Sequence, residues 1–194
     1  MLVMLKPSRN EGEALNLFVG QSDYKLVSEG IDDAIGAASV LEHYDFDHVF
    51  CSDSKAARET WDIISRSAPF LSHKTPVLCP QFRDRSGGVL EGLDWKDIRK
   101  MLSPRKYKVW ERDFTEAPEM GESLVDVEDR AVRMVAKRIK PLLDNRTPKN
   151  VLIIADGVVI SLIIKRLQKL SEEETKAIYP QSCVPYFHHG KLNL

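Results

Sequence analysis

The feature that most constrains the fold is an apolar stretch at residues 150–167, with the sequence Asn-Val-Leu-Ile-Ile-Ala-Asp-Gly-Val-Val-Ile-Ser-Leu-Ile-Ile-Lys-Arg-Leu. Residues 151–155 form a continuous apolar and partly β-branched run, which is typical of a strand covered on both faces. Gly157 interrupts the run, and apolar residues then resume at helical spacing. The stretch therefore predicts a strand, a tight turn and a helix.

Asp156 lies at the turn between this strand and this helix. In open α/β sheets, ligands bind outside the carboxyl ends of the strands, so Asp156 is a candidate functional residue. The simpler interpretation is an ordinary solvated aspartate in a turn. The residue alone does not decide between the two.

A second strand end is predicted near the N-terminus, where the apolar residues 2–5 are followed by Lys6, Pro7, Ser8 and Arg9. This loop should leave the sheet at the same edge as Asp156. Pro7 has neither an N–H nor an ionisable group, so its neighbours supply the loop's polar side chains. Lys6 and Arg9 are candidates for binding an anion, and the alternative is that both are solvated surface cations.

The rest of the chain alternates between helical and strand patterns. A helix is expected at 30–41, a strand at 46–51, a helix capped by Ser54 or Asp53 at 54–64, a short edge strand at 76–79, and a last strand at 184–187. Ser123 and Asp126 are expected to cap a further long helix. The first of these helices should bury its apolar positions, which are Ile31, Ala34, Ile35, Ala38 and Leu41. We expect one α/β domain over residues 1–194, with a mostly parallel sheet between helices.

Composition and charge exclude several classes of function. At 194 residues and 43% hydrophobic content the chain can bury one core, and a formal net charge of −1 gives no field that would favour nucleic acid. The three cysteines form no C-x-x-C pair, so neither a disulfide framework nor a zinc site is indicated, and a reducing compartment is expected. The opening Met-Leu-Val-Met-Leu is too short for a membrane span. These features predict a cytoplasmic protein without membrane insertion, although import after removal of a presequence stays open.

An ordered series of residues resembles the cofactor-dependent phosphoglycerate mutases of the histidine phosphatase superfamily. The resemblance covers nearly the whole chain and is carried by the order of short matches, none of which is specific alone. The matches are Leu2-Val-Met-Leu-Lys-Pro, Phe18-Val-Gly, Asp23, Ser28-Glu-Gly, Phe46-Asp-His-Val-Phe-Cys-Ser, Lys55, Thr60, Asp84-Arg85, Gly88, Leu90-Glu-Gly-Leu, Trp110, Gly121-Glu-Ser-Leu and Val151-Leu-Ile-Ile-Ala-Asp-Gly. The resemblance implies a three-layer α/β/α fold.

The positions that carry that family's chemistry hold different residues here. The family's Arg-His-Gly loop, whose histidine takes the phosphoryl group, falls on Lys6, Pro7 and Ser8. The second histidine of the family falls on Asp156, and the proton-transfer glutamate on Asp84. Proline cannot act as a nucleophile, so the resemblance implies that no phosphohistidine forms.

The cationic cradle of the family is also changed. Its remaining basic positions fall on Ala56, Trp95, Glu111 and Arg112. Together with Lys6, Pro7 and Asp156, the family's seven basic or imidazole positions therefore hold two cations, Lys6 and Arg112, and two anions, Glu111 and Asp156. At roughly 5 Å and an effective dielectric constant near 20, one carboxylate facing a phosphate costs about 3 kcal/mol. We expect phosphorylated small molecules to bind weakly or not at all.

These differences predict a catalytically degenerate phosphoglycerate mutase-like protein that needs no cofactor and acts as a binding or structural subunit. Its partner would be a second copy of the chain or another protein, contacting either the sheet edge near residues 46–51 or the crevice, with Trp95 as an aromatic anchor. The alternative is an active mutase or phosphatase that uses Asp84, Lys6 and Arg112 in a rearranged site.

Two further interpretations receive less support. The segment around Asp156 faintly resembles the haloacid dehalogenase phosphatases, but their nucleophilic aspartate would fall on Ile154. The His188-His189 pair is most simply a surface pair, and metal binding is the alternative.

Overall fold

The computed structural model describes residues 1–104, 113–190 and 192. Its five-stranded sheet has the order β3-β2-β4-β1-β5. The strands are β1 (Leu2–Leu5), β2 (His48–Cys51), β3 (Val77–Leu78), β4 (Val151–Ile154) and β5 (Tyr186–His188). Only the pairing of β5 with β1 is antiparallel among these strands, so the prediction of a mostly parallel sheet is confirmed.

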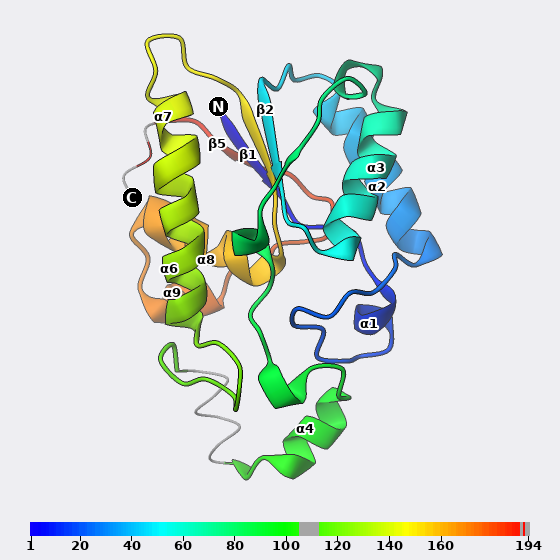
Figure 1. Cartoon of the computed structure of the whole chain (residues 1–194), viewed down its shortest axis with the longest axis vertical. Coiled ribbons are helices and arrows are strands. Elements are labelled where there is room, and N and C mark those ends of the chain that lie inside the picture. The colour runs from blue at the N-terminus through cyan, green and yellow to red at the C-terminus, as the bar shows by residue number, and fades with distance from the viewer. Residues whose placement is uncertain (105–112, 191, 193–194) are drawn as a thin grey trace.

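Helices cover both faces of the sheet. Helices α2 (Ser28–Leu41) and α3 (Lys55–Ser67) lie on one side, and α6 (Leu124–Met134) and α8 (Gly157–Gln168) on the other (Figure 1). Alternate residues of β1 contribute to two separate apolar clusters, because neighbouring side chains in a strand point to opposite faces. The three-layer α/β/α arrangement is therefore confirmed.

Local capping explains where the long helices begin. The Ser54 hydroxyl accepts a hydrogen bond from the Ala57 N–H at the start of α3, as predicted. Ser123 and Asp126 form the expected capping box at the start of α6. This helix continues as a π-helical turn at Val135–Ile139 and then as α7 (Lys140–Leu143), whose first turn holds Pro141, a residue that has no N–H to donate.

Shorter elements gather at one end of the sheet. Helices α1 (Glu11–Ala14), α4 (Trp95–Met101) and α9 (Glu172–Lys176) lie toward the lower end of Figure 1, where the carboxyl ends of the parallel strands point. In the described part of the chain, 3₁₀ turns also lie at Pro69–Leu71, Pro80–Phe82 and Gly88–Leu90. No helix in the described part of the chain combines the length and apolar character needed to cross a membrane.

The predicted buried face of α2 is partly wrong. Ile31 and Ile35 are 43% and 46% exposed, whereas the buried face includes Gly30 and three alanines in addition to Leu41. The reason is a close approach to the first loop, because a Cβ added to Gly30 would lie 2.4 Å from the carbonyl oxygen of Arg9. Small residues therefore face the protein, and the isoleucines face outward.

The expectation of a sheet edge near residues 46–51 is also wrong. Strand β2 lies between β3 and β4, and Phe46 and Phe50 are buried. The two-residue strand β3 pairs with the end of β2 and covers what would otherwise be an edge. Phe50 and Cys51 of β2 are therefore paired on both sides. The short edge strand predicted at 76–79 is confirmed as β3.

Candidate functional site

Three parallel strands deliver polar residues to one end of the sheet. Lys6 follows β1, Ser52 follows β2 and Asp156 follows β4, and the strand registers place Leu5 and Cys51 on either side of Ile154. The two loops predicted to share one sheet edge therefore do share it.

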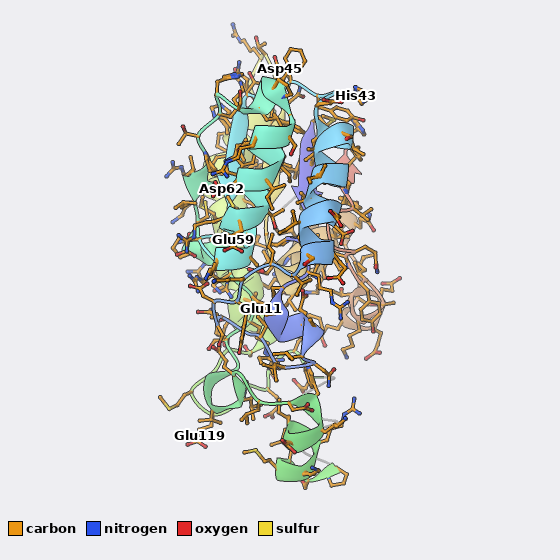
Figure 2. All side chains as sticks on the ribbon, turned by 90° about the vertical axis from the view of Figure 1, so that its right-hand side faces the viewer. Glu11, His43, Asp45, Glu59, Asp62 and Glu119 are labelled. Carbon is orange, nitrogen blue, oxygen red and sulfur yellow. The ribbon has the colours of Figure 1, made fainter. Side chains whose placement is uncertain are left out.

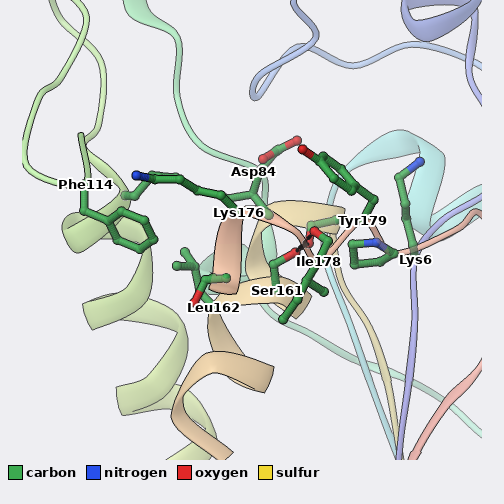
Figure 3. Close-up of a pocket in the computed structure, with 13 residues that line it drawn as sticks. Lys6, Asp84, Phe114, Ser161, Leu162, Lys176, Ile178 and Tyr179 are labelled. Carbon is green, nitrogen blue, oxygen red and sulfur yellow. Dashed lines mark hydrogen bonds between the residues drawn. The ribbon is translucent and has the colours of Figure 1, made fainter. Parts of the chain in front are cut away.

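Two adjoining cavities open beside these strand ends, and we call their combined space the crevice. The larger encloses about 840 Å³ and the smaller about 320 Å³. Figure 3 shows the smaller cavity, with Asp84 and Tyr179 at its upper side and Leu162 and Ile178 below. Five residues line both cavities, namely Asp84, Leu124, Val158, Lys176 and Tyr179. Asp84, predicted from the resemblance to lie at the site, thus lines both cavities.

Asp84 and Asp156 come from two loops that are hydrogen-bonded to each other. The Asp156 N–H donates to the carbonyl oxygen of Phe82 at 3.2 Å, two residues before Asp84. The Asp84 carboxylate accepts from the Arg85 N–H at 2.7 Å, and the Asp156 carboxylate accepts from the Ser52 hydroxyl at 3.2 Å. Both carboxyls are half-buried.

The surroundings of these two carboxyls favour their protonated forms. Burial raises the pKa of Asp84 to about 6, against opposing effects of the Arg85 N–H and the charge of Lys6. Burial, and then the negative charge of Asp84, raise the pKa of Asp156 to about 8. Of the two carboxyls, Asp84 lines both cavities of the crevice, whereas Asp156 lies behind the lining and lines neither.

Lys6 is engaged within the chain. Its Nζ donates to Glu13 Oε1 at 2.8 Å and to the Ser182 hydroxyl at 2.9 Å. Its alkyl stem lies against Gly157, where an added Cβ would be 3.3 Å from Lys6 Cδ and Cε. Lys6 lines the smaller cavity, but its charge is offset by Glu13.

The rest of the first loop does not present polar groups to the crevice. Pro7 and Ser8 are both buried. The Ser8 N–H donates to the Thr60 hydroxyl at 3.0 Å, and the Ser8 hydroxyl forms a hydrogen bond with the Cys183 sulfur at 2.7 Å. Arg9 is exposed and lines neither cavity of the crevice. Arg112, the other residual anion-binding candidate, lies outside the described residues, as does Glu111.

The described guanidinium groups near Asp84 are used to hold loops together. Arg130 donates to the carbonyl oxygens of Gln81, Arg83 and Asp84 and to the Glu122 carboxylate. Arg83 is ion-paired with Asp53 at 2.7 Å. Arg85 donates to two carbonyl oxygens, those of Glu122 and Glu116.

Two positions of the family's cationic cradle hold uncharged side chains. Ala56 is buried, and Trp95 lines the larger cavity with its ring 5.2 Å from that of Phe18. Trp95 thus lies in the crevice, where the sequence comparison placed it. Its indole gives that wall an apolar surface instead of a positive charge.

Sequence reasoning missed Glu13, Lys176 and Tyr179 as lining residues. A signal existed for Glu13, because Asn10 and Glu13 form a capping box that places α1 directly after the first loop. Lys176 pairs with Glu173 at 2.8 Å and lies 5.6 Å from the centre of the Phe114 ring. No motif in the sequence points to Lys176 or Tyr179.

None of the five histidines lines the crevice. His43 lies near the top of the molecule in Figure 2, well above Glu11 of α1. His188 is in β5 and pairs with Leu2, and the His189 ring stacks on Phe187. Within residues 1–104, 113–190 and 192, no group of three histidine, cysteine or acidic side chains is arranged to hold a metal ion.

Comparisons with known proteins agree on one family. The model of the "Histidine phosphatase superfamily (branch 1)" matches residues 9–184. The match begins directly after Lys6, Pro7 and Ser8. A 2,3-bisphosphoglycerate-dependent phosphoglycerate mutase of Cytophaga hutchinsonii is 30% identical over 200 residues, covering 100% of this chain and 90% of the mutase. A mutase of the same name from Chlamydia felis is 29% identical, covering 91% of this chain and 88% of its own length.

Solved structures give the same result. A mycobacterial glucosyl-3-phosphoglycerate phosphatase superposes with a TM-score of 0.77 at 25% identity, covering 93% of this chain and 85% of the phosphatase. The protein YhfR of Bacillus stearothermophilus superposes with a TM-score of 0.80 at 22% identity, covering 93% of this chain and 86% of its own, a similarity of fold.

Proposed function

The chain belongs to the histidine phosphatase superfamily, and from this premise we propose that it is a catalytically degenerate member that serves as a binding or structural subunit. The observation that carries the proposal is the pair Pro7 and Asp156 at the positions of the two family histidines, beside a crevice that none of the five histidines lines. A phosphoryl-accepting nucleophile and its partner are both replaced.

Charge supports the same proposal. Phosphoryl transfer is stabilised by cations aimed at the phosphate oxygens. Here Lys6 is paired with Glu13, Trp95 and Ala56 replace two cations of the family, and the carboxyl of Asp156 replaces the second histidine at the end of β4. At the two histidine positions of the family, a phosphoester would meet a proline, Pro7, and a carboxyl, Asp156.

The direct test is incubation of the purified protein with 2,3-bisphosphoglycerate, followed by assay for acid-labile protein-bound phosphate. We expect none, because loss of a nucleophile alone lowers the rate by about 10⁶. Hydrolysis of p-nitrophenyl phosphate and interconversion of phosphoglycerates should likewise stay at background.

The alternative function is an active mutase or phosphatase with a rearranged site. It is favoured by the names of the similar proteins, a mutase 30% identical over the whole chain and a phosphatase of the same fold. The variant Asp84→Asn separates the two cases. Activity that disappears in this variant belongs to the crevice and supports the alternative, whereas activity that the variant retains comes from a contaminant.

The role as a subunit has its own test. Sedimentation of the pure protein should show a dimer, or pull-downs from native extract should recover a stoichiometric protein partner. A stable interface would bury at least roughly 1,200 Å² in total. A monomer that recovers no partner would contradict this part of the proposal.

A further inference from the structure

The smaller cavity of the crevice has a mostly apolar wall. Phe114, Val158, Leu162 and Ile178 line it, and Asp84 lies at its upper side in Figure 3. Its volume of about 320 Å³ lies within the range of roughly 300–1,000 Å³ that is usual for small-molecule sites. The smaller cavity therefore has the size and the surface to hold the apolar body of a small ligand.

The two aliphatic hydroxyl groups that line the smaller cavity are already hydrogen-bonded within the chain. The Ser161 hydroxyl lies 3.0 Å from the carbonyl oxygen of Gly157 and 3.1 Å from that of Ile178. The Thr175 hydroxyl donates to the carbonyl oxygen of Ser171 at 2.7 Å. The protons of both hydroxyls are therefore used by the backbone and are not available to a ligand.

The charged groups of the crevice leave no excess of either sign. Lys6 donates to Glu13 at 2.8 Å and to the Ser182 hydroxyl at 2.9 Å, and Lys176 is paired with Glu173 at 2.8 Å. Among the described residues that line the two cavities, three basic side chains are matched by three acidic ones, namely Lys6, Arg85 and Lys176 against Glu13, Asp84 and Glu173. Because burial of an ion costs its hydration and no net charge here compensates that cost, the crevice favours an uncharged ligand.

Asp84 is the polar lining group with capacity for a ligand. Its carboxyl accepts from the Arg85 N–H at 2.7 Å, and its two oxygens together offer about four acceptor positions. An ionised carboxyl accepts from a hydroxyl and a protonated one donates to it, and a hydroxyl can play either part. Asp84 can therefore bind a hydroxyl group in both of its protonation states.

We propose that the smaller cavity binds an uncharged, largely apolar molecule that carries one hydroxyl group. The apolar body lies between Phe114 and the α8 residues Val158 and Leu162, and the hydroxyl is hydrogen-bonded to the Asp84 carboxyl. The inference rests on the proposed function, since it takes the crevice to be free of phosphoester chemistry. It gives the ligand class of a protein that binds without catalysis.

Three probes with one ring system test the ligand class on the unmodified protein. Naphthylmethanol, naphthylmethylammonium and naphthylmethyl phosphate share the same apolar body and differ in charge, and backbone amide NMR measures their dissociation constants. We expect the alcohol to bind roughly tenfold more tightly than either ion, because the ions must give up more hydration. Equal or tighter binding of the ammonium or the phosphate would overturn the proposal, and so would a failure of the alcohol to bind.

A matched pair of variants locates the site. Val158 of α8 is half-buried and lines both cavities, so the ring of Val158→Phe should occupy the space of the ligand and weaken binding of naphthylmethanol roughly tenfold. Val40→Phe makes the same change at a side chain of α2 that is 43% exposed, on the other face of the sheet, and it should leave the affinity unchanged. Equal affinities in the two variants would show adsorption elsewhere and would refute the assignment.

Variants of Asp84 test the polar end of the site. Asp84→Leu should weaken binding of naphthylmethanol at least roughly fivefold, because the hydroxyl then enters the cavity without a partner. Asp84→Asn keeps a hydrogen-bond donor and an acceptor, and its affinity should stay within about twofold of the wild type. An unchanged affinity in Asp84→Leu would refute the role of Asp84. This second pair and the three probes decide the matter if Val158→Phe does not fold.

The experiment separates this inference from the proposed function. Release of inorganic phosphate from naphthylmethyl phosphate by the wild type, lost in Asp84→Asn, would contradict the proposed function, whatever the affinities are. Absence of phosphate release together with no preference for the alcohol would refute the inference alone.

Discussion

The ammonium of Lys6 lies 2.8 Å from the carboxylate of Glu13, so the cation that follows β1 is neutralised by the short helix that follows it in the chain. Glu13 also accepts from the Asn10 N–H and thereby fixes the first turn of α1. The ion pair and the helix cap share one side chain, which makes the neutralisation a stable part of the fold.

Replacing Glu13 should restore some affinity for anions. In Glu13→Gln the side-chain oxygen can still cap α1, but Lys6 loses its counter-charge and becomes available to an anion. We expect the affinity for inorganic phosphate to rise roughly fivefold at low ionic strength. NMR titration with phosphate measures it, and Asp97→Asn, which frees the exposed Lys100, is the matched control. An unchanged affinity in Glu13→Gln would show that Lys6 is not what limits anion binding.

Asp156 should make the protein less stable as the pH rises. Its pKa is about 8 in the folded state and near 3.8 when unfolded, so between these values the folded state binds the proton more tightly. The stabilisation is full below pH 3.8 and is lost as the pH rises toward 8. Because each pKa unit corresponds to about 1.4 kcal/mol, Asp156→Asn should gain at least about 1 kcal/mol relative to the wild type between pH 5 and pH 8.5.

Urea unfolding of both proteins at the two pH values measures this difference. Asp47→Asn is a control whose stability difference from the wild type should stay constant between these pH values, because the Asn150 N–H, donating at 2.8 Å, lowers the pKa of Asp47. The contribution of Asp47 is present above its unfolded pKa of 3.8 and is lost only at more acidic pH. A stability gap between Asp156→Asn and the wild type that does not change with pH would contradict the prediction.

Restoring both histidines should not restore the activity of the family. In the double variant Pro7→His, Asp156→His the nucleophile and its partner return, but Ala56 and Trp95 still replace two cradle cations and Lys6 stays paired. Without these donors the transferred phosphoryl group lacks most of its electrostatic stabilisation. We expect a mutase turnover far below the usual enzyme value of about 10 s⁻¹. A folded variant with turnover within tenfold of that value would show that the cradle is less important than we infer.

Glu128 should be a strong determinant of stability. It is 4% exposed on α6 and accepts from Lys165 at 2.8 Å and from Arg166, both of α8, so it joins two helices on one face of the sheet. Removing one member of a buried ion pair leaves the other uncompensated. We expect Glu128→Ala to cost roughly 2–3 kcal/mol in the free energy of unfolding. The adjacent Asp129→Asn, which breaks the exposed pair with Arg133, should cost less than about 1 kcal/mol, and equal costs would contradict the prediction.

Local signals in the sequence were sufficient for most of the fold. The strand at 151–155 and the caps at Ser54 and Ser123 depend on neighbouring residues, and all are present. The rule that parallel strands end at one sheet edge likewise brought Lys6 and Asp156 together. These features need no knowledge of distant contacts.

The features that sequence reasoning missed depend on distant parts of the chain. The outward position of Ile31 follows from the approach of Gly30 to the backbone of Arg9, and the interior position of β2 follows from its pairing with β3. In the crevice, Tyr179 comes from a segment with no recognisable motif. From the sequence alone, Lys6 could be either paired or free to bind an anion. Only the position of α1 shows that it is paired with Glu13.

The lengths of the two outer strands determine how the sheet meets other chains. Strand β3 has two residues and is flanked by Pro76 and Pro80, and β5 has three, whereas each inner strand has four. An outer strand this short, flanked by prolines that have no N–H to donate, offers few backbone groups for an incoming strand to pair with. We therefore expect the sheet to resist edge-to-edge aggregation and any specific assembly to form through helices and loops.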